Sequence, residues 1–286
     1  MNVTPRQPGM LFAAGSPERS QIAVYGMPFD GTASFRPGSR FGPQAIREAT
    51  YGLELFSPAQ GQEVSAEAIW DALDLVVPAG GVQAALLGIE RFVDGILDQG
   101  LIPFGLGGEH LVSLAPVRAL AKRHPDLWLV QFDAHPDLRD TFQGESLSHA
   151  TVMRRILDII GPGRVLQFGV RSADKDEWPL THRLPVTPQG MAEARRLIGD
   201  GACYLSLDID GFDPAFAPGT GTPEPGGFSW QEWEALLGQL SGFNWVGMDL
   251  VEVAPQLDPS GITAVLAAKA VRELLIILAA GPGHVA

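Results

Sequence analysis

Segments that look like buried strands alternate with segments that look like helices along the whole chain. Apolar runs of strand length occur at residues 21–29, 101–107, 127–135, 164–170, 203–210 and 245–253. Helical periodicity occurs at residues 43–52, 80–99, 113–124, 149–160, 189–199, 230–241 and 263–280, with Ser148 and Ser229 as candidate N-caps. Such alternation is typical of a parallel sheet with helices on both faces. We therefore expect one α/β domain over residues 1–286, without linkers or internal repeats.

Composition excludes several classes of protein. The chain has 286 residues, of which 45% are hydrophobic and 19% are charged, as in soluble globular proteins. Its net charge of −13 argues against a nucleic-acid surface. We recognise no signal peptide at the N-terminus, and charged residues interrupt the late apolar segment 262–280, so we expect a cytoplasmic protein without a membrane span. The single cysteine, Cys203, cannot form an internal disulfide and is expected to be a small buried hydrophobe.

Polar clusters follow three of the predicted strands. These clusters are GGEH, DAHPD and SLDID, and their metal-binding candidates are His110, Asp133, His135, Asp137, Asp208 and Asp210. If the strand continues past residue 132, its alternation would place the three ionisable residues of DAHPD on one wall. Each cluster alone has a simpler explanation, such as a solvated strand end, a hydrogen-bonded core histidine or an aspartate that caps a loop. Together they indicate a site at the carboxyl ends of the strands, where ligands collect in such folds.

The charge of these candidates favours two divalent metal ions. Four aspartates and two neutral histidines carry four negative charges, which two divalent cations would neutralise. An oxygen-rich set suits octahedral manganese better than a structural zinc. A water bridging two such ions, held about 3.5–4 Å apart, would ionise near neutral pH and act as a nucleophile. Phosphate-binding loops and nucleophile elbows are absent from the sequence, and a cysteine in a strand core makes a poor nucleophile.

These motifs resemble the ureohydrolases, the arginase and agmatinase family. The resemblance rests on GGEH, DAHPD and DIDGFDPAFAPGTGTPEPGG, and it extends to residues 26–50 and 249–274. It implies a three-layer α/β/α fold around a mainly parallel eight-stranded sheet, with two Mn²⁺ ions per chain and hydrolysis of a guanidinium group to urea. It also implies a homo-oligomer, a trimer or a hexamer.

Further residues are assigned by the same resemblance. The six metal candidates match the family's ligands, and Asp137 could also orient the metal-bound hydroxide or relay its proton. His149 matches a histidine that shuttles protons at the mouth of the site, and Glu252 matches a glutamate that binds the guanidinium. A carboxylate can bind that planar cation through two hydrogen bonds. His149 could instead simply occupy the first turn of its helix, and Glu252 could be a surface strand end or the partner of an arginine.

The loop after DAHPD favours agmatine as the substrate. Arginases have a polar loop there that recognises an amino-acid head, whereas this chain has LRDTFQGESLSHAT, with Asp140 and Glu145. These residues, together with Asp174, suit a terminal ammonium. We therefore expect hydrolysis of agmatine to putrescine and urea, with Asp174 and Glu145 as candidate substrate contacts beside Glu252 and His149.

Other assignments stay open at this point. Guanidinobutyrate, guanidinopropionate, proclavaminate or arginine could be the substrate, because loops select the substrate while the metal motifs are shared. A catalytically silent binding protein of the same fold is the alternative from another class, and retention of every site residue argues against it. A single-zinc amide hydrolase of the deacetylase type would need fewer ligands, so the set of six candidate ligands argues against that class.

Overall fold

A parallel sheet of eight strands forms the centre of the protein. The computed structural model describes residues 9–10, 12–78 and 81–281. Every pair of neighbouring strands in the sheet is parallel. The strands run in the order β4 (Ile69–Asp74), β1 (Ile22–Met27), β5 (Ile102–Gly107), β10 (Asn244–Val251), β9 (Ala202–Asp208), β6 (Trp128–Phe132), β7 (Val165–Phe168) and β8 (Arg183–Leu184). The expected eight-stranded sheet is therefore confirmed.

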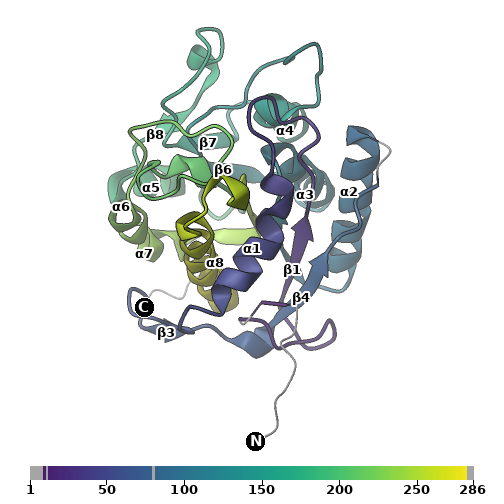
Figure 1. The fold of residues 1–286 in the computed structure, drawn as a ribbon. Coiled ribbons are helices and arrows are strands. Elements are labelled where there is room, and N and C mark those ends of the chain that lie inside the picture. Colours follow the sequence, from purple (N-terminus) through teal and green to yellow (C-terminus); the bar gives the residue numbers. More distant parts are fainter. Residues whose placement is uncertain (1–8, 11, 79–80, 282–286) are drawn as a thin grey trace, which may run out of the picture.

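Helices cover both faces of this sheet and complete three layers (Figure 1). One face carries α1 (Gly42–Thr50), α5 (Pro188–Ile198), α6 (Trp230–Glu234), α7 (Leu237–Leu240) and α8 (Ile262–Ala280). The other carries α2 (Val82–Asp98), α3 (Leu114–Ala121) and α4 (Val152–Ile160). Successive residues of β1 divide between the two apolar cores, with Ile22 and Val24 in one and Ala23 and Tyr25 in the other. This division follows from the two-residue period of a strand that is buried on both sides.

The predicted elements are present, with boundaries that shift by a few residues. The helix expected at 80–99 is α2, and residue 80 lies outside the described residues. The helix expected at 230–241 divides into α6 and α7, and the capping box of Ser229 at the start of α6 confirms the predicted cap. Ser148 also forms a capping box, but it begins a 3-10 turn, His149–Thr151, that leads into α4.

Two strands of the sheet, β4 and β8, lie outside the predicted set. Both are edge strands, and β8 has only two residues. Asp71 and Asp74 interrupt the apolar pattern of β4 because they pair with the buried side chain of Arg47. A short antiparallel pair, β2 (Phe56–Ser57) and β3 (Gln62–Glu63), lies apart from the main sheet.

The last two strands fill the middle of the sheet. β9 and β10 lie between β5 and β6, so four central neighbours end at the same edge. The helix that follows them, α8, is largely buried against the sheet, as its apolar sequence predicts. Within the described ranges, no helix has both the length and the apolar character needed to cross a membrane. Cys203 is fully buried in β9, as expected.

Candidate metal centre and substrate pocket

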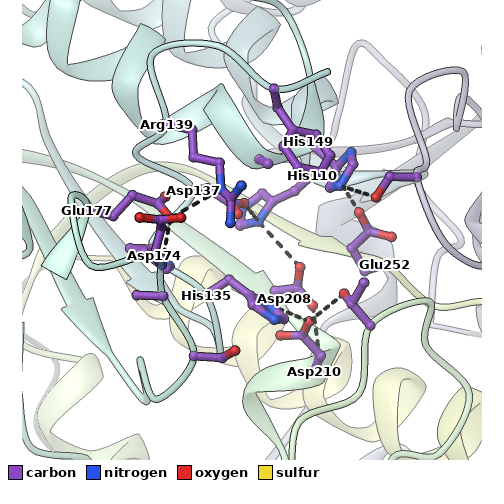
Figure 2. A pocket seen from close by; sticks show the side chains of 17 residues that line it. His110, His135, Asp137, Arg139, His149, Asp174, Glu177, Asp208, Asp210 and Glu252 are labelled. Carbon is purple, nitrogen blue, oxygen red and sulfur yellow. Dashed lines mark hydrogen bonds and ion pairs between the residues drawn. The ribbon is translucent and has the colours of Figure 1, made fainter. Parts of the chain in front are cut away.

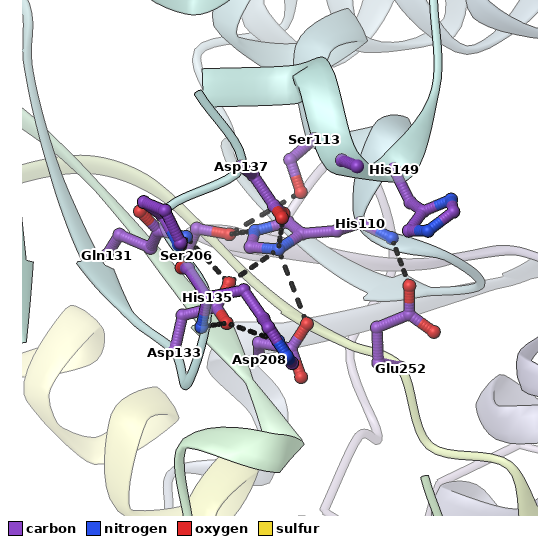
Figure 3. Close-up of polar contacts among 12 residues, drawn as sticks. His110, Ser113, Gln131, Asp133, His135, Asp137, His149, Ser206, Asp208 and Glu252 are labelled. Carbon is purple, nitrogen blue, oxygen red and sulfur yellow. Dashed lines mark hydrogen bonds and ion pairs between the residues drawn. The ribbon is translucent and has the colours of Figure 1, made fainter. Parts of the chain in front are cut away.

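One nitrogen of His110 faces three carboxylates. His110 begins a 3-10 turn just beyond β5. Its Nδ1 lies 2.9 Å from Asp133 Oδ2, 3.1 Å from Asp137 Oδ2 and 3.3 Å from Asp208 Oδ2 (Figure 3). The imidazole is 1% exposed, so water does not screen these oxygens from one another. Such a convergence of one nitrogen and three oxygens is suited to a divalent cation.

The other nitrogen of His110 is held by a hydrogen-bonded chain behind it. Ser206 Oγ donates to Asp249 Oδ1 at 2.7 Å and lies 2.9 Å from His110 Nε2. Since the serine proton is used by Asp249, the serine accepts the Nε2 proton of His110. In the neutral ring Nδ1 then carries no proton, and among the described residues it has no hydrogen-bond partner. A histidine that binds a metal is oriented in this way by a partner on its second nitrogen.

A second group of ligands shares Asp133 with the first. Asp133, His135 and Asp210 present ligand atoms close enough together to hold one ion, and so do His110, Asp133 and Asp208. His135 Nδ1 lies 3.1 Å from Asp210 Oδ2 and 3.6 Å from Asp133 Oδ1. Asp133 therefore turns one oxygen toward each histidine. A carboxylate shared in this manner can bridge two ions.

The loops after the strands, rather than strand alternation, bring these ligands together. The strand expected at 127–135 ends at Phe132, so the three ionisable residues of DAHPD do not form one wall of a strand. Asp133 and Asp137 turn toward His110, whereas His135 turns toward Asp210. Asp208 ends β9 and caps the next turn, since its Oδ1 accepts from Asp210 N at 2.8 Å while its Oδ2 faces His110. The capping explanation for Asp208 is thus compatible with its place in the candidate metal cluster.

Two of the site residues have an unusual backbone conformation. Asp137 and Glu252 have φ angles of 52° and 66°, in the left-handed region that side chains other than glycine seldom adopt. Residues in such conformations cluster at functional sites, where the surrounding structure holds them in place. Here both residues line the same pocket.

The electrostatics of the cluster fit bound cations. Burial opposes charge on His110, but the carboxylates of Asp133, Asp137 and Asp208 outweigh it and raise its pKa well above the usual value. Burial likewise opposes charge on His135, yet Asp210 and Asp133 raise its pKa to about 12. The buried carboxylates thus require positive charge among them, which either protons or metal ions can provide. The donor set and the bare Nδ1 of His110 both fit a pair of divalent ions.

A pocket opens above these ligands (Figure 2). It has a volume of about 370 Å³, within the range of small-molecule sites, and its lining includes His110, His135, Asp208 and Asp210. Glu252, which follows β10, also lines it. Glu252 Oε1 accepts from His110 N at 2.8 Å, and burial together with the neighbouring Glu109 raises the pKa of Glu252 to about 8. In the described part of the chain its carboxylate is bonded to His110 N and pairs with no arginine.

His149 lies at the same pocket, held by a loop that follows β1. Its backbone N donates to Thr32 Oγ1 at 3.0 Å. Its ring lies with Nδ1 3.4 Å from Thr32 Oγ1 and Nε2 3.3 Å from Ser34 Oγ, and Phe142 packs edge-on against it. Burial lowers the pKa of His149. The position of His149 in the first turn before α4 is therefore compatible with a place at the pocket.

The substrate contacts expected from the sequence divide between two cavities. Asp174 lines the pocket, with its carboxylate exposed. Glu145 instead borders a neighbouring cavity, at the end of a tight turn over residues 142–145. Asp140, which was interpreted in the same way, pairs with Arg155 outside the pocket.

A cation that sequence reasoning missed, Arg139, lines the pocket near Asp174. Its Nε lies 3.3 Å from Glu177 Oε2, and its guanidinium stacks over the Phe142 ring at 4.9 Å. Buried Glu177 also accepts from the backbone N of Leu138, which holds the DAHPD loop. Arg139 lies two residues beyond the last aspartate of DAHPD, and this spacing is the one signal that could have indicated it.

Known proteins that are similar to this chain identify its family. The arginase family model matches residues 20–277. The agmatinase of Bacillus anthracis is 44% identical over 281 residues, which cover 94% of this chain and 96% of that protein. The solved structure of the agmatine ureohydrolase of Thermoplasma volcanium superposes with a TM-score of 0.85 at 33% identity, covering 95% of this chain and 94% of that one. Proclavaminate amidino hydrolase from Streptomyces clavuligerus gives a TM-score of 0.87 at 32% identity, covering 96% and 98%. This chain belongs to the arginase family.

Proposed function

We propose that the protein is an agmatinase, which hydrolyses agmatine to putrescine and urea with two manganese ions. The observation that supports this most directly is the position of Asp133 between two histidine-containing ligand sets, directly below a pocket that Glu252 lines. The likeness to two proteins described as agmatinase and agmatine ureohydrolase supports the choice of substrate. The excess of carboxylate over imidazole ligands supports manganese.

The six ligand candidates would hold the two ions in the sets described above. His110, Asp133, Asp137 and Asp208 would hold one, and Asp133, His135 and Asp210 the other. Two divalent cations bound there would supply a water molecule acidic enough to attack the guanidinium carbon near neutral pH. Asp137, itself a member of the first set, would orient that water and accept its proton.

Glu252 would bind the substrate guanidinium. One of its oxygens is already held by the backbone N of His110, which fixes the carboxylate relative to a metal ligand. A guanidinium bound to the other oxygen would lie directly over the metal centre, with its plane set by the carboxylate. Desolvation of Glu252 makes a cation a favourable partner for its carboxylate.

His149 would supply the proton that the leaving amine takes up. Attack forms a C–O bond at the guanidinium carbon and breaks the C–N bond to the butylamine chain, and the departing nitrogen must be protonated. A histidine can donate that proton because it titrates near neutral pH. Burial, which lowers the pKa of His149, makes its ring release a proton more readily.

The far end of the pocket suits the ammonium group of agmatine. It is lined by Arg139, Asp174 and Glu177, so it contains one guanidinium and two carboxylates. Glu177 pairs with Arg139, which leaves the exposed carboxylate of Asp174 for the substrate. Proclavaminate amidino hydrolase has a similar fold and a different substrate in its name, so the loops that carry these residues decide the substrate.

The test is urea release from agmatine, arginine and 4-guanidinobutyrate by manganese-loaded protein, with metal content measured on the same sample. We expect about two manganese ions per chain and a kcat/KM for agmatine at least tenfold above the others. Higher activity on another of the three substrates would overturn agmatine while retaining the hydrolysis. Two bound metals without urea from any guanidino compound would favour the catalytically silent alternative.

A further inference from the structure

Glu109 is a buried carboxylate that the mechanism above does not use. It precedes His110 in the GGEH segment and is 0% exposed. Both of its oxygens accept from one residue, Thr32, with Oε2 2.8 Å from Thr32 N and Oε1 2.6 Å from Thr32 Oγ1. Burial of a carboxylate is unfavourable unless hydrogen bonds replace its hydration. Both hydrogen bonds therefore hold the same residue, Thr32, in the loop that follows β1.

Thr32 also forms a hydrogen bond with His149 and so links Glu109 to it. The hydroxyl proton of Thr32 is used by Glu109, so Oγ1 is free to accept the backbone N–H of His149, at 3.0 Å. Thr32 Oγ1 and Ser34 Oγ also lie beside the two nitrogens of the His149 ring, at 3.4 Å and 3.3 Å. The place of the ring therefore depends on a loop 117 residues away in sequence, and Glu109 anchors that loop.

The segment Gly108–His110 contacts the other parts of the site as well. Glu252 N donates to Gly108 O at 2.9 Å, and His110 N donates to Glu252 Oε1 at 2.8 Å. His110 itself faces the metal-binding carboxylates. This segment therefore touches every part of the site. It contains His110, its backbone holds Glu252, and Glu109 holds His149 through Thr32.

We propose that Glu109 is a positioning residue which, through Thr32, fixes His149 relative to His110 and Glu252. This rests on the proposed hydrolysis. The length of the side chain is part of the proposal, because Glu109 N donates to Phe29 O at 2.7 Å and so fixes its backbone. An aspartate there would be shorter by about 1.5 Å, one carbon–carbon bond, and could not reach both donors of Thr32.

The experiment is a double-mutant cycle with agmatine as substrate. Thr32→Val removes the hydroxyl at nearly constant shape, Thr32→Ser retains it, and Glu109→Gln replaces one acceptor oxygen by a donor. Each is measured in the wild-type and in the His149→Asn background, for kcat, KM and manganese content. Thr181→Val, at a half-buried threonine whose hydroxyl donates to Trp178 O, is the matched control and leaves kcat unchanged.

We expect Thr32→Val and Glu109→Gln to lower kcat about ten- to hundredfold, with KM within about threefold of wild type and two metals retained. Thr32→Ser should keep kcat within about threefold. In the His149→Asn background, Thr32→Val should change kcat by less than about twofold, because the residue through which it acts is gone.

Several outcomes would overturn the proposal. The same fold loss in both backgrounds would mean that Thr32 acts elsewhere, and loss of metal from Glu109→Gln would mean that Glu109 supports His110 instead. If His149→Asn has no measurable activity, a crystal structure of Thr32→Val is the test instead. The proposal predicts that the imidazole ring of His149 is displaced in this structure. A His149 ring in its wild-type position would refute the proposal. Absence of urea release from the wild type would refute the proposed function instead, and that result is distinct from these.

Discussion

Ser206 links His110 to the buried carboxylate of Asp249, and its replacement by alanine should weaken metal binding without changing a ligand. His110 Nε2 lies 2.9 Å from Ser206 Oγ, and Ser206 Oγ lies 2.7 Å from Asp249 Oδ1. Tyr204 holds the other oxygen of Asp249, at 2.7 Å. Ser206→Ala removes the one described acceptor of the Nε2 proton. The imidazole is then free to rotate or to carry its proton on Nδ1, where the metal should bind.

The expected magnitude follows from the loss of this orientation. Removal of a hydrogen-bond partner behind a metal-binding histidine costs about 10–100-fold in affinity. At about 1.4 kcal/mol per tenfold, this corresponds to about 1.4–2.8 kcal/mol. The unpaired Nε2–H also destabilises the protein, but it does so in the apo and the metal-bound forms alike, so this part cancels in the affinity.

The assay is titration of metal-free protein with manganese against a competing chelator, alongside the free energy of unfolding. Ser57→Ala is the matched control, because Ser57 is an equally buried serine whose hydroxyl donates to Glu273, a residue of α8, and not to a metal ligand. It should lower stability and leave metal affinity unchanged. An affinity of Ser206→Ala within about twofold of wild type, or an equal loss in Ser57→Ala, would refute the reasoning.

Four further tests address separate parts of the protein. Asp210→Ala should lose about one of two manganese ions per chain and more than about a hundredfold in kcat, by metal analysis and urea assay; full activity with one ion would contradict the two-ion site. Glu252→Gln should keep both ions and lower kcat/KM for agmatine about a hundredfold, since an amide binds guanidinium poorly, and unchanged kinetics would remove Glu252 from the pocket. Asp174→Asn should raise KM for agmatine about tenfold whereas Glu145→Gln should leave it unchanged, because only the former lines the pocket; steady-state kinetics in which Glu145→Gln has the larger effect would reverse this assignment. Burial raises the pKa of Cys203 to about 12, so a thiol reagent at pH 8 should leave the native protein unmodified and label the unfolded one, and rapid native labelling would show that the thiol is accessible.

The central strands and the candidate metal cluster could be predicted from the sequence because each has a strong local pattern. Strands buried on both faces are continuous apolar runs, and ionisable residues stand out where those runs end. The edge strand β4 lacked this pattern, since Asp71 and Asp74 alternate with apolar residues to pair with Arg47. These two ion pairs join residues that are separated by 24 and by 27 positions in the sequence, which no local pattern reveals.

The residues around the ligands could not be predicted for a related reason. Ser206 and Asp249 lie inside the apolar runs of β9 and β10, and only the parallel register of these strands, with Asp249 opposite Ser206, brings them together. Thr32 and Glu109 are 77 residues apart, and although Glu109 lies in GGEH, no local pattern connects it to Thr32. Glu145 illustrates the same dependence on geometry: its charge and its nearness to DAHPD favour a substrate contact, whereas in the structure it ends a two-residue turn and lines a neighbouring cavity. Charge near a motif indicates a site only when the loop geometry is known.

The order in which the strands join the sheet explains why the site draws on such distant residues. Strands β4, β1 and β5 form one half of the sheet and β6, β7 and β8 the other, while the last two strands enter between them. His110 follows β5 and Asp133 follows β6, so they meet only across β9 and β10, which bring Asp208 and Glu252. The carboxylates that repel one another are thus gathered by the packing of the apolar strands, whose burial opposes that repulsion. Ions that bind the assembled cluster and not the unfolded chain would then stabilise the whole sheet, because the complete set of ligands exists only when both halves and the two central strands are in place.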